Sequence, residues 1–540
     1  MGKALKRAML KSHVVEDPAH AWTFLTREPG DPVSIQKAGT IRKGQGRNPN
    51  MNADGKSDTD VVPRKELNKV MLNTAETLEE RSVTEGKTVQ PTVTQTQCWK
   101  QTLSGLARIR NAARKGRNIR FTSLMHHITP ELLKVSYEKL NRKAATGVDG
   151  TTWIEYQYEL AMRLESLYEC VHNGTYRALP SRRVWISKSD KGKRPLGIAA
   201  LEDKIVQQAV TDILTQIYET DFLGFSYGFR LERSQHNALD ALSVGIKIKK
   251  ISWILDADLK SFFDTVDHSW MIKFLEHRIA DQRILRLIGK WLKAGVIEDG
   301  LWKETSEGTP QGSGISPLLA NIYLHYVFDL WMKKWRKKKC GDIIVVRYAD
   351  DIVIGFQYET VANRFKTELS ERLNRFNLRL NEKKTRLIRF GRFAAMQRSE
   401  RGQGKPETFN FLGFTHICGR QRSNGKFKII RKSISQRQKA KLVKVKEELK
   451  YRHNNSVPEQ GVWLQSVIRG YFNYHAVPGN IDALKTFRYR ISKIWYRALR
   501  RRSHKARSLK WDRMNRLIDQ WLPPAKILHP YPEQRLIVNT

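Results

Sequence analysis

Cysteine is scarce in this sequence, and long apolar runs are missing from it. Four cysteines occur in 540 residues, and they stand too far apart to build a zinc knuckle or a disulfide framework. No stretch approaches the roughly 20 consecutive apolar residues of a membrane-spanning helix. The N-terminus has no apolar core of the signal-peptide type, and Glu16 and Asp17 argue against a transit peptide. The sequence therefore predicts a cytoplasmic protein with reduced cysteines and no membrane partner.

Acidic residues are also few. The chain has 54 aspartates and glutamates against 97 lysines and arginines, which gives a formal net charge of +43 and a pI near 10.1. A surplus of this size repels itself in a compact fold unless a polyanion neutralises it, and it extends along the whole chain. The expected partner is a long nucleic acid. An acidic membrane surface is the competing explanation, but no basic helix stands apart as an anchor.

The chain begins with a polar region and then becomes regular. The first hundred residues are rich in glycine, proline, asparagine and threonine, which predicts a flexible extension with at most one helix, near Lys65–Leu78. From about Phe121 the pattern is more ordered, and Thr129-Pro130 is typical of a capped helix start. Short predicted strands follow, at Arg182–Ser187 and Gly197–Ala199.

The central third alternates predicted strands and helices. Trp253–Leu259 has the apolar character of a buried strand, and Leu319–Trp331 repeats apolar residues at helical spacing. Two further apolar runs, Ile343–Tyr348 and Ile352–Phe356, flank the acidic pair Asp350-Asp351. This pattern predicts a β-hairpin with carboxylates at its tip.

Beyond about Lys432 the pattern becomes wholly helical. Three segments carry apolar stripes that can bury one another, while their other faces carry lysines and arginines with almost no acidic residues. Such a face favours contact with a phosphate backbone over a merely solvated surface. The stripes consist of Leu442, Val445 and Leu449, of Trp463, Leu464, Val467, Ile468 and Tyr471, and of Leu484, Phe487, Ile491, Ile494 and Trp495.

The acidic residues suit a metal-dependent transfer of nucleotides. Joining a nucleotide to a 3′ hydroxyl uses two Mg²⁺ ions about 4 Å apart, held by carboxylates that converge from separate strands. Asp258 ends one predicted strand, and Asp350 and Asp351 sit at the hairpin tip. Side chains alternate along a strand, so Asp350 and Asp351 can face the same ion only if the turn changes the direction of one of them. We expect Asp350 to bridge the two ions and Asp351 to be a secondary ligand. Asp256 and Asp258 point the same way, so periodicity alone does not decide which of the two is the metal ligand.

Four motifs, in order along the chain, resemble those of reverse transcriptases. Tyr348–Asp351 is similar to their Tyr-X-Asp-Asp box, and Asp258–Asp264 to their first catalytic motif. Gly308–Pro317 resembles the loop under the incoming nucleotide, and Lys188–Gly197 the fingers motif of the intron-encoded branch. Other segments are characteristic of group II intron proteins, namely Thr146–Gly150, Ser226–Arg230, Arg233–His236, Leu380–Thr385, Phe411–Phe414 and Ile468–Tyr474. From about Phe121 onward, the chain thus resembles the maturases and reverse transcriptases that group II introns encode.

The resemblance implies roles for individual residues in catalysis. Asp258, Asp350 and Asp351 would hold the two Mg²⁺ ions. Phe263 follows Asp258 by five positions, which marks it as the gate against a ribose 2′ hydroxyl and selects Asp258 over Asp256. Ordinary core packing is the alternative role for Phe263.

The resemblance also implies residues that bind nucleotides and RNA. Lys188 and Arg194 would clamp the triphosphate, Gln311 would contact the nucleotide, and Lys384 would lie near the departing pyrophosphate. Surface solubility is the alternative for Lys384, since Lys383 could replace it. RNA binding during splicing would fall to three residues for which helix packing is the alternative, Arg469, Tyr471 and Asn473.

The implied fold is an α+β right-hand polymerase with fingers, a palm and an all-helical thumb. The expected division is a polar N-terminal extension (1–110), fingers (111–225), palm (226–425), a helical thumb or maturase domain X (426–505) and a basic DNA-binding tail (506–540). The implied partners are group II intron RNA, target DNA and deoxynucleoside triphosphates. Together they would form a ribonucleoprotein associated with a bacterial nucleoid, whose oligomeric state is left open.

Several alternatives are weighed against this function. No cysteine follows Cys418, so we expect no His-Asn-His endonuclease of the kind that many family members append. A splicing-only maturase is disfavoured by aspartates at all three catalytic positions. A retron-like or diversity-generating reverse transcriptase would lack the long thumb with Arg469–Tyr474, and a viral RNA polymerase usually has Gly-Asp-Asp where this chain has Ala349-Asp350-Asp351.

Overall fold

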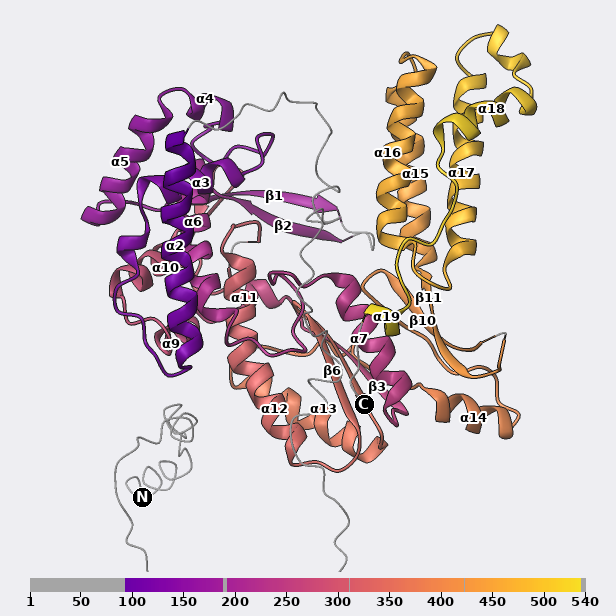
Figure 1. Cartoon of the computed structure of the whole chain (residues 1–540), viewed down its shortest axis with the longest axis horizontal. Coiled ribbons are helices and arrows are strands. Elements are labelled where there is room, and N and C mark those ends of the chain that lie inside the picture. The colour runs from indigo at the N-terminus through magenta and orange to yellow at the C-terminus, as the bar shows by residue number, and fades with distance from the viewer. Residues whose placement is uncertain (1–92, 188–191, 310, 422, 536–540) are drawn as a thin grey trace, which may run out of the picture. The chain divides into compact units, whose positions relative to one another are not determined.

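The computed structural model describes residues 93–535 apart from 188–191, 310 and 422, so the helix predicted near Lys65–Leu78 lies outside the described residues. Figure 1 traces a mixture of helices and β-sheets, which confirms the predicted α+β class. Among the described residues, no helix combines the length and the apolarity that crossing a membrane requires.

The first described region is helical and packs around α6. The Thr129 side chain caps α3 by accepting a hydrogen bond from the Leu132 amide, and Pro130 occupies the first turn, as predicted. α6 contacts both α2 and α3 and is buried along most of its length. The elements are α2 (Val93–Lys115), η3 (Met125–His127), α3 (Pro130–Lys139), α4 (Trp153–Gln157), α5 (Leu160–Asn173) and α6 (Leu201–Tyr218).

A four-stranded sheet of order β2-β1-β4-β5 follows. Its strands are β1 (Ser181–Ser187), β2 (Lys193–Ile198), β4 (Val296–Glu298) and β5 (Leu301–Lys303). β1 and β2 form an antiparallel hairpin, in which Ile186 lies opposite Arg194. The predicted strands are thus present, although β2 begins earlier than Gly197. Two helices precede β4, α9 (His268–Glu276) and α10 (Gln282–Lys293).

A second four-stranded sheet, of order β6-β7-β3-β8, has only antiparallel pairings. Its strands are β3 (Trp253–Asp258), β6 (Ile343–Tyr348), β7 (Asp351–Phe356) and β8 (Arg386–Arg389). Helix α7 (Gln235–Ile248) packs on β6, and α13 (Glu359–Asn374) contacts β3 and β7. β6 and β7 are buried along almost their whole length, which explains why their sequences are continuous apolar runs.

A long helical run precedes β6 and brings an unpredicted feature. The expected helix consists of α11 (Ser316–Leu324), a π-helical turn (His325–Asp329) and α12 (Leu330–Lys337). Pro317 lies in the first turn of α11, as predicted. All five residues of the π-helical turn are buried, and such turns often accompany functional sites. The short helix α8 (Phe262–Thr265) follows β3.

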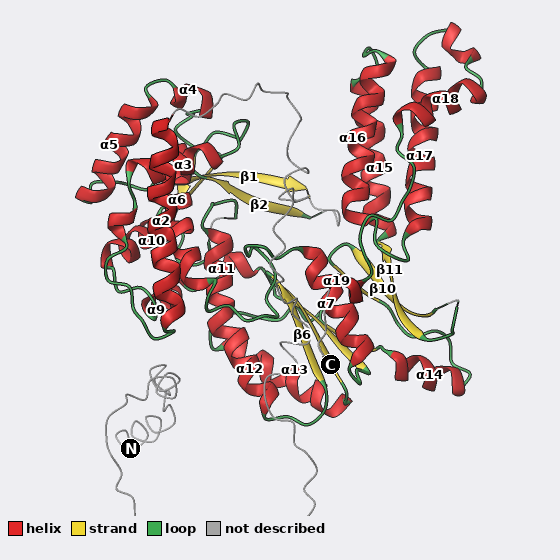
Figure 2. Cartoon of the chain, in the orientation of Figure 1, coloured by secondary structure: helices red, strands yellow, loops and turns green. Residues whose placement is uncertain are grey.

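The C-terminal part contains a three-stranded sheet and a helical bundle. The sheet consists of β9 (Phe409–Phe411), β10 (Phe414–Arg420) and β11 (Phe427–Ser433), and α14 (Arg392–Glu400) precedes it. Figure 2 shows the bundle helices α15 (Ser435–Tyr451), α16 (Val457–His475) and α17 (Ile481–Arg500). The three predicted apolar stripes form or border the bundle core, which confirms them.

The last described segment folds back onto the rest of the chain. Its elements are η5 (Lys505–Ser508), α18 (Trp511–Trp521) and α19 (Pro532–Arg535). α18 packs on α16, while α19 contacts α7. At that contact Glu533 lies 2.6 Å from Lys247, and Arg535 lies 3.1 Å from the buried Asp240. Much of the segment predicted as a DNA-binding tail is therefore packed against other elements.

Candidate active site

Three aspartates meet where β3 and the β6–β7 hairpin end. Antiparallel pairing sets Asp258, the last residue of β3, opposite Asp351, the first residue of β7. Asp350 stands one residue earlier, in the turn that follows β6. The structure thus brings together the three aspartates that the sequence singled out.

The turn between β6 and β7 has an uncommon backbone conformation. Ala349 has a φ of +55°, in the left-handed region that residues other than glycine seldom adopt. This conformation changes the direction of the backbone directly before Asp350 and Asp351. Gly228 presses against the turn, because a β-carbon there would lie 2.3 Å from the Ala349 amide nitrogen.

Arg347 supports this turn, a role that sequence reasoning did not assign. Its fully buried guanidinium donates from Nε and Nη2 to the carboxylate of Asp329 at 2.7 and 2.5 Å, and from Nη1 to the Ala349 carbonyl at 3.0 Å. Nη1 also donates to Asn321 Oδ1, whose own amide donates to the Gly228 carbonyl at 2.6 Å. Burial alone would raise the pKa of Asp329, but the Arg347 guanidinium keeps that pKa below its ordinary value.

Negative charge accumulates around the turn. Although the Asp351 side chain reaches the surface, the protein atoms around it remove much of its hydration. This loss, together with the carboxylates of Asp350, Asp258 and Asp256, raises the pKa of Asp351 to about 7. Burial likewise raises the pKa of Asp350, against the opposing charge of Arg194. Burial and the mutual repulsion of these carboxylates thus favour their protonated forms, and a bound divalent cation would offset that repulsion.

Asp258 has partners from the Leu380–Thr385 segment. Asn381 Nδ2 donates to Asp258 Oδ2 at 2.9 Å, and Lys384 Nζ lies 3.8 Å from the same oxygen. The Lys384 side chain is 61% exposed, so it can turn toward a bound phosphate without losing buried contacts. The backbone amide of Asp258 donates to the Thr385 hydroxyl at 3.4 Å. The role of Asn381 was not predicted.

Two of the predicted nucleotide-binding residues contact each other. Arg194 Nε donates to Gln311 Oε1 at 2.6 Å, and Gln311 Nε2 donates to Asp264 Oδ1 at 3.3 Å. Because Arg194 acts electrostatically on Asp350, this pair lies within reach of the carboxylates. Lys188, the other predicted triphosphate clamp, lies outside the described residues.

Phe262 and Phe263 have different surroundings. Phe262 is only 2% exposed, whereas Phe263 is half-buried and meets Phe262 edge to face with ring centroids 5.3 Å apart. The Phe263 carbonyl accepts a hydrogen bond from the Thr309 amide at 2.7 Å, which fixes it to the Gly308–Pro317 loop. A partly exposed ring beside that loop suits a gate better than a core residue.

The three predicted RNA-binding residues lie on α16 in different environments. Arg469 is exposed, whereas Tyr471 is buried and stacks on Phe487 with ring centroids 3.7 Å apart. Asn473 is half-buried, and its carbonyl accepts a hydrogen bond from His529 Nε2 at 2.6 Å. Arg469 is thus open to solvent, whereas the Tyr471 ring packs in the bundle core.

The carboxylate oxygens of this site are of the kind that Mg²⁺ takes as ligands. Within the described ranges, no group of three or more histidine, cysteine, aspartate or glutamate side chains is arranged to hold an ion by itself. Mg²⁺ commonly takes only one or two carboxylates and completes its shell with water and substrate phosphates. The carboxylates of Asp258, Asp350 and Asp351 are ligands of this kind, so they fit Mg²⁺ that shares its shell with a nucleotide.

Known proteins resemble the segment that holds this site. The family model for reverse transcriptase (RNA-dependent DNA polymerase) matches residues 186–416, which include all three aspartates. Protein YkfC of Escherichia coli (strain K12) is 36% identical over 310 residues, which cover 50% of this chain and 80% of YkfC. The group II intron-encoded protein LtrA of Lactococcus lactis subsp. cremoris is 34% identical over 295 residues, 53% of this chain and 48% of LtrA.

A eukaryotic intron protein also matches part of the chain. The putative COX1/OXI3 intron 1 protein of Saccharomyces cerevisiae is 29% identical over 324 residues, which cover 51% of this chain and 38% of that protein. The chain thus spans less than half of the intron proteins it matches but most of YkfC. The family model, the matched relatives and the three aspartates all indicate a reverse transcriptase. The chain belongs to the reverse transcriptases, within the group II intron-encoded reverse transcriptases and maturases.

Proposed function

We propose that this reverse transcriptase copies group II intron RNA into DNA and binds the same RNA to assist its splicing. The observation that carries the proposal is the register of β3 and β7, which sets Asp258 opposite Asp351. Arg194, which is hydrogen-bonded to Gln311, acts electrostatically on the neighbouring Asp350. Nucleotide addition needs carboxylates for metal ions next to cations that hold a triphosphate. The choice of template rests on relatives named for group II introns.

Asp258, Asp350 and Asp351 would hold two Mg²⁺ ions, with Asp350 as the bridging ligand. When bound, the ions activate the primer hydroxyl and stabilise the charge on the triphosphate. Arg347 keeps the turn that carries two of these aspartates in its left-handed conformation. This support reduces the rearrangement that ligand binding would otherwise require.

The remaining residues of the site would bind and select the nucleotide. Arg194 and Lys188 hold the triphosphate, and Gln311 orients the nucleotide from the loop that it shares with Thr309. Phe263 occupies the space that a ribose 2′ hydroxyl would need. Lys384, beside Asp258, neutralises charge on the departing pyrophosphate.

The parts of the chain would divide the work as a right hand does. Fingers (111–225) and palm (226–425) enclose the template and nucleotide, and the helical thumb (426–505) holds RNA through its basic face. Residues 506–540 contact target DNA, whose first strand is cut by the intron RNA and supplies the primer end. Phosphate contacts of this kind make RNA affinity fall steeply with salt.

The experiment compares cDNA synthesis with splicing in one protein preparation. Asp350→Ala should stop primer extension on an RNA template yet still promote splicing of the cognate intron, because RNA binding does not need the metal ligands. Arg469→Gln should weaken splicing more than extension on a generic primed template. Lys337→Gln, which removes an exposed charge from α12, serves as the matched control and should affect neither.

Each outcome selects one function. Loss of splicing by folded, RNA-bound Asp350→Ala would contradict the division of labour. Splicing without any extension by the wild-type protein would favour a splicing-only maturase. Extension without any effect on splicing would favour a retron-like enzyme.

A further inference from the structure

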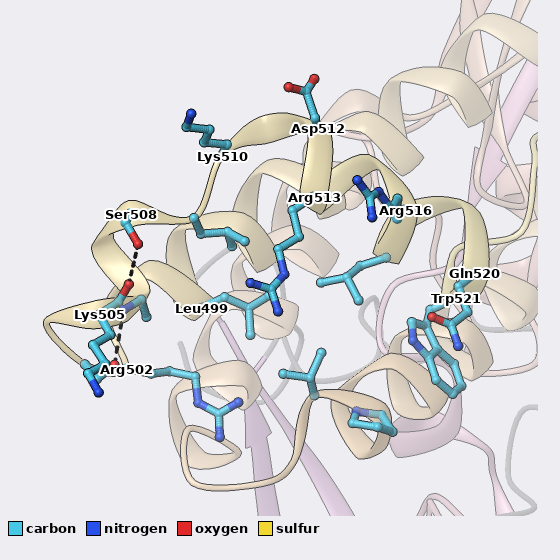
Figure 3. A pocket seen from close by; sticks show the side chains of 16 residues that line it. Leu499, Arg502, Lys505, Ser508, Lys510, Asp512, Arg513, Arg516, Gln520 and Trp521 are labelled. Carbon is cyan, nitrogen blue, oxygen red and sulfur yellow. Dashed lines mark hydrogen bonds between the residues drawn. The ribbon is translucent and has the colours of Figure 1, made fainter.

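A pocket of about 990 Å³ opens near the end of the helical bundle (Figure 3). Its walls come from the start of α16, the end of α17, η5 and α18. None of the catalytic or nucleotide-binding residues described above lines it. Its lining divides into an apolar floor and a cationic rim.

The floor is apolar and packs against helix α16. Leu499 is 4% exposed, and Leu509, Leu517 and Trp521 are half-buried around the same space. Trp521 lies directly against α16, because a β-carbon on Gly461 would come within 2.5 Å of the indole ring. The absence of a side chain at Gly461 thus lets the indole form part of the wall.

The rim carries positive charge that the described protein does not neutralise. Lys505, Arg513 and Arg516 are exposed and form no ion pair within the described residues. Figure 3 shows Arg513 extending from α18 into the space beside Leu499, whereas the carboxylate of Asp512 points away from it. The pocket therefore offers apolar surface and free cations to one ligand.

We infer that this pocket binds one unstacked nucleotide of a single-stranded nucleic acid, with the base on the apolar floor and the phosphodiester at Arg513 and Arg516. The inference rests on the proposed function, since it takes nucleic acid as the partner. Ligand pockets commonly measure about 300–1,000 Å³. A base inside a duplex is stacked and paired, so it cannot enter, and the pocket discriminates single strands from duplexes.

The test measures the affinity of the full-length protein for three fluorescent probes. These are a short uridine-only RNA, a thymidine-only DNA of the same length, and an RNA duplex with the same number of phosphates. Arg513→Gln with Arg516→Gln should weaken single-strand binding about tenfold and reduce its log-log salt slope by about 0.7, from one lost phosphate contact. Duplex binding should change less than about twofold.

A second variant tests the apolar floor without altering charge. Ser508 lines the pocket and is exposed, so Ser508→Trp should fill the space without disturbing the bundle core. It should weaken single-strand binding several-fold while the salt slope stays unchanged. Arg497→Gln with Arg501→Gln is the matched control, because it removes two exposed charges from α17 and its border that do not line the pocket.

The control pair should weaken single-strand and duplex binding equally. Loss confined to the RNA strand assigns the pocket to intron RNA, and loss confined to the DNA strand assigns it to a target strand. The inference is overturned if the Arg513 and Arg516 variant weakens all probes equally, or if Ser508→Trp leaves single-strand binding unchanged. Wild-type primer extension, measured in parallel, reports on the polymerase function independently of the pocket.

Discussion

Substitutions at Arg347 test whether this residue supports the turn between β6 and β7, which carries Asp350. Arg347→Met removes a fully buried guanidinium and leaves the Asp329 carboxylate buried, with His325 Nδ1 3.8 Å away. Removing one partner of a buried ion pair costs about 3–5 kcal/mol. Since domains are stable by about 5–15 kcal/mol, this variant should lose much of its stability, and its activity alone would not isolate the role of the turn.

The double variant Arg347→Met with Asp329→Leu separates stability from positioning. Removing both charges leaves no uncompensated carboxylate, so most of the stability should return. The Ala349 carbonyl still lacks its donor, and Ala349 still needs a conformation that costs about 1–2 kcal/mol. A hydrogen bond from a charged group contributes about 1.5–3 kcal/mol, so kcat for primer extension should fall about 10- to 100-fold.

The assay is steady-state extension of a primed RNA template, with urea unfolding of the same proteins. KM for deoxynucleotides should change little, because Arg194 and Gln311 remain in place. Arg278→Met with Asp221→Leu is the matched control, since it removes another buried pair, 3.0 Å apart, in the helical region near Phe121. Wild-type kcat in the folded Arg347 double variant, or an equal loss of kcat in the control, would refute the positioning role.

Local elements of this fold follow from local patterns. Apolar runs on both sides of the acidic pair predicted β6 and β7, because strands covered by helices bury both faces. The same pattern placed Asp350 and Asp351 at the tip of the hairpin, whereas the choice of Asp258 over Asp256 came from the resemblance to reverse transcriptases. β2 begins at Lys193, before the predicted start at Gly197, because its pairing with β1 continues through polar residues that give no apolar signal.

Contacts between distant segments do not follow from such patterns. Asn381 reaches Asp258 across 123 positions, and Glu533 reaches Lys247 across 286. Arg347 does leave a signal, because a charged residue inside an apolar strand needs a buried partner. Its partner Asp329 lies in a π-helical turn, whereas regular helical spacing predicts an uninterrupted helix there. The sequence pattern therefore does not identify Asp329 as the partner.

Replacing Asp258 or Asp350 with asparagine should abolish primer extension without unfolding the protein, and residual extension above about a tenth of wild type would remove that residue from the catalytic set. Phe263→Val should lower the ratio of kcat/KM for deoxynucleotides over ribonucleotides, whereas an unchanged ratio would return Phe263 to core packing. His416 is fully buried against Phe409, and burial lowers its pKa to about 3. The pKa of this histidine in the unfolded chain is about 6.5. Below that pH the unfolded chain therefore binds a proton that the folded protein does not, and the free energy of unfolding falls by about 1.4 kcal/mol for each unit by which the pH decreases. His416→Phe keeps the ring contact and removes the titrating group. Urea unfolding between about pH 6.5 and pH 5 should therefore show a free energy of unfolding that depends less on pH than in the wild type, by about 1.4 kcal/mol per pH unit. An unchanged slope would mean that the buried histidine already carries its proton in the folded state.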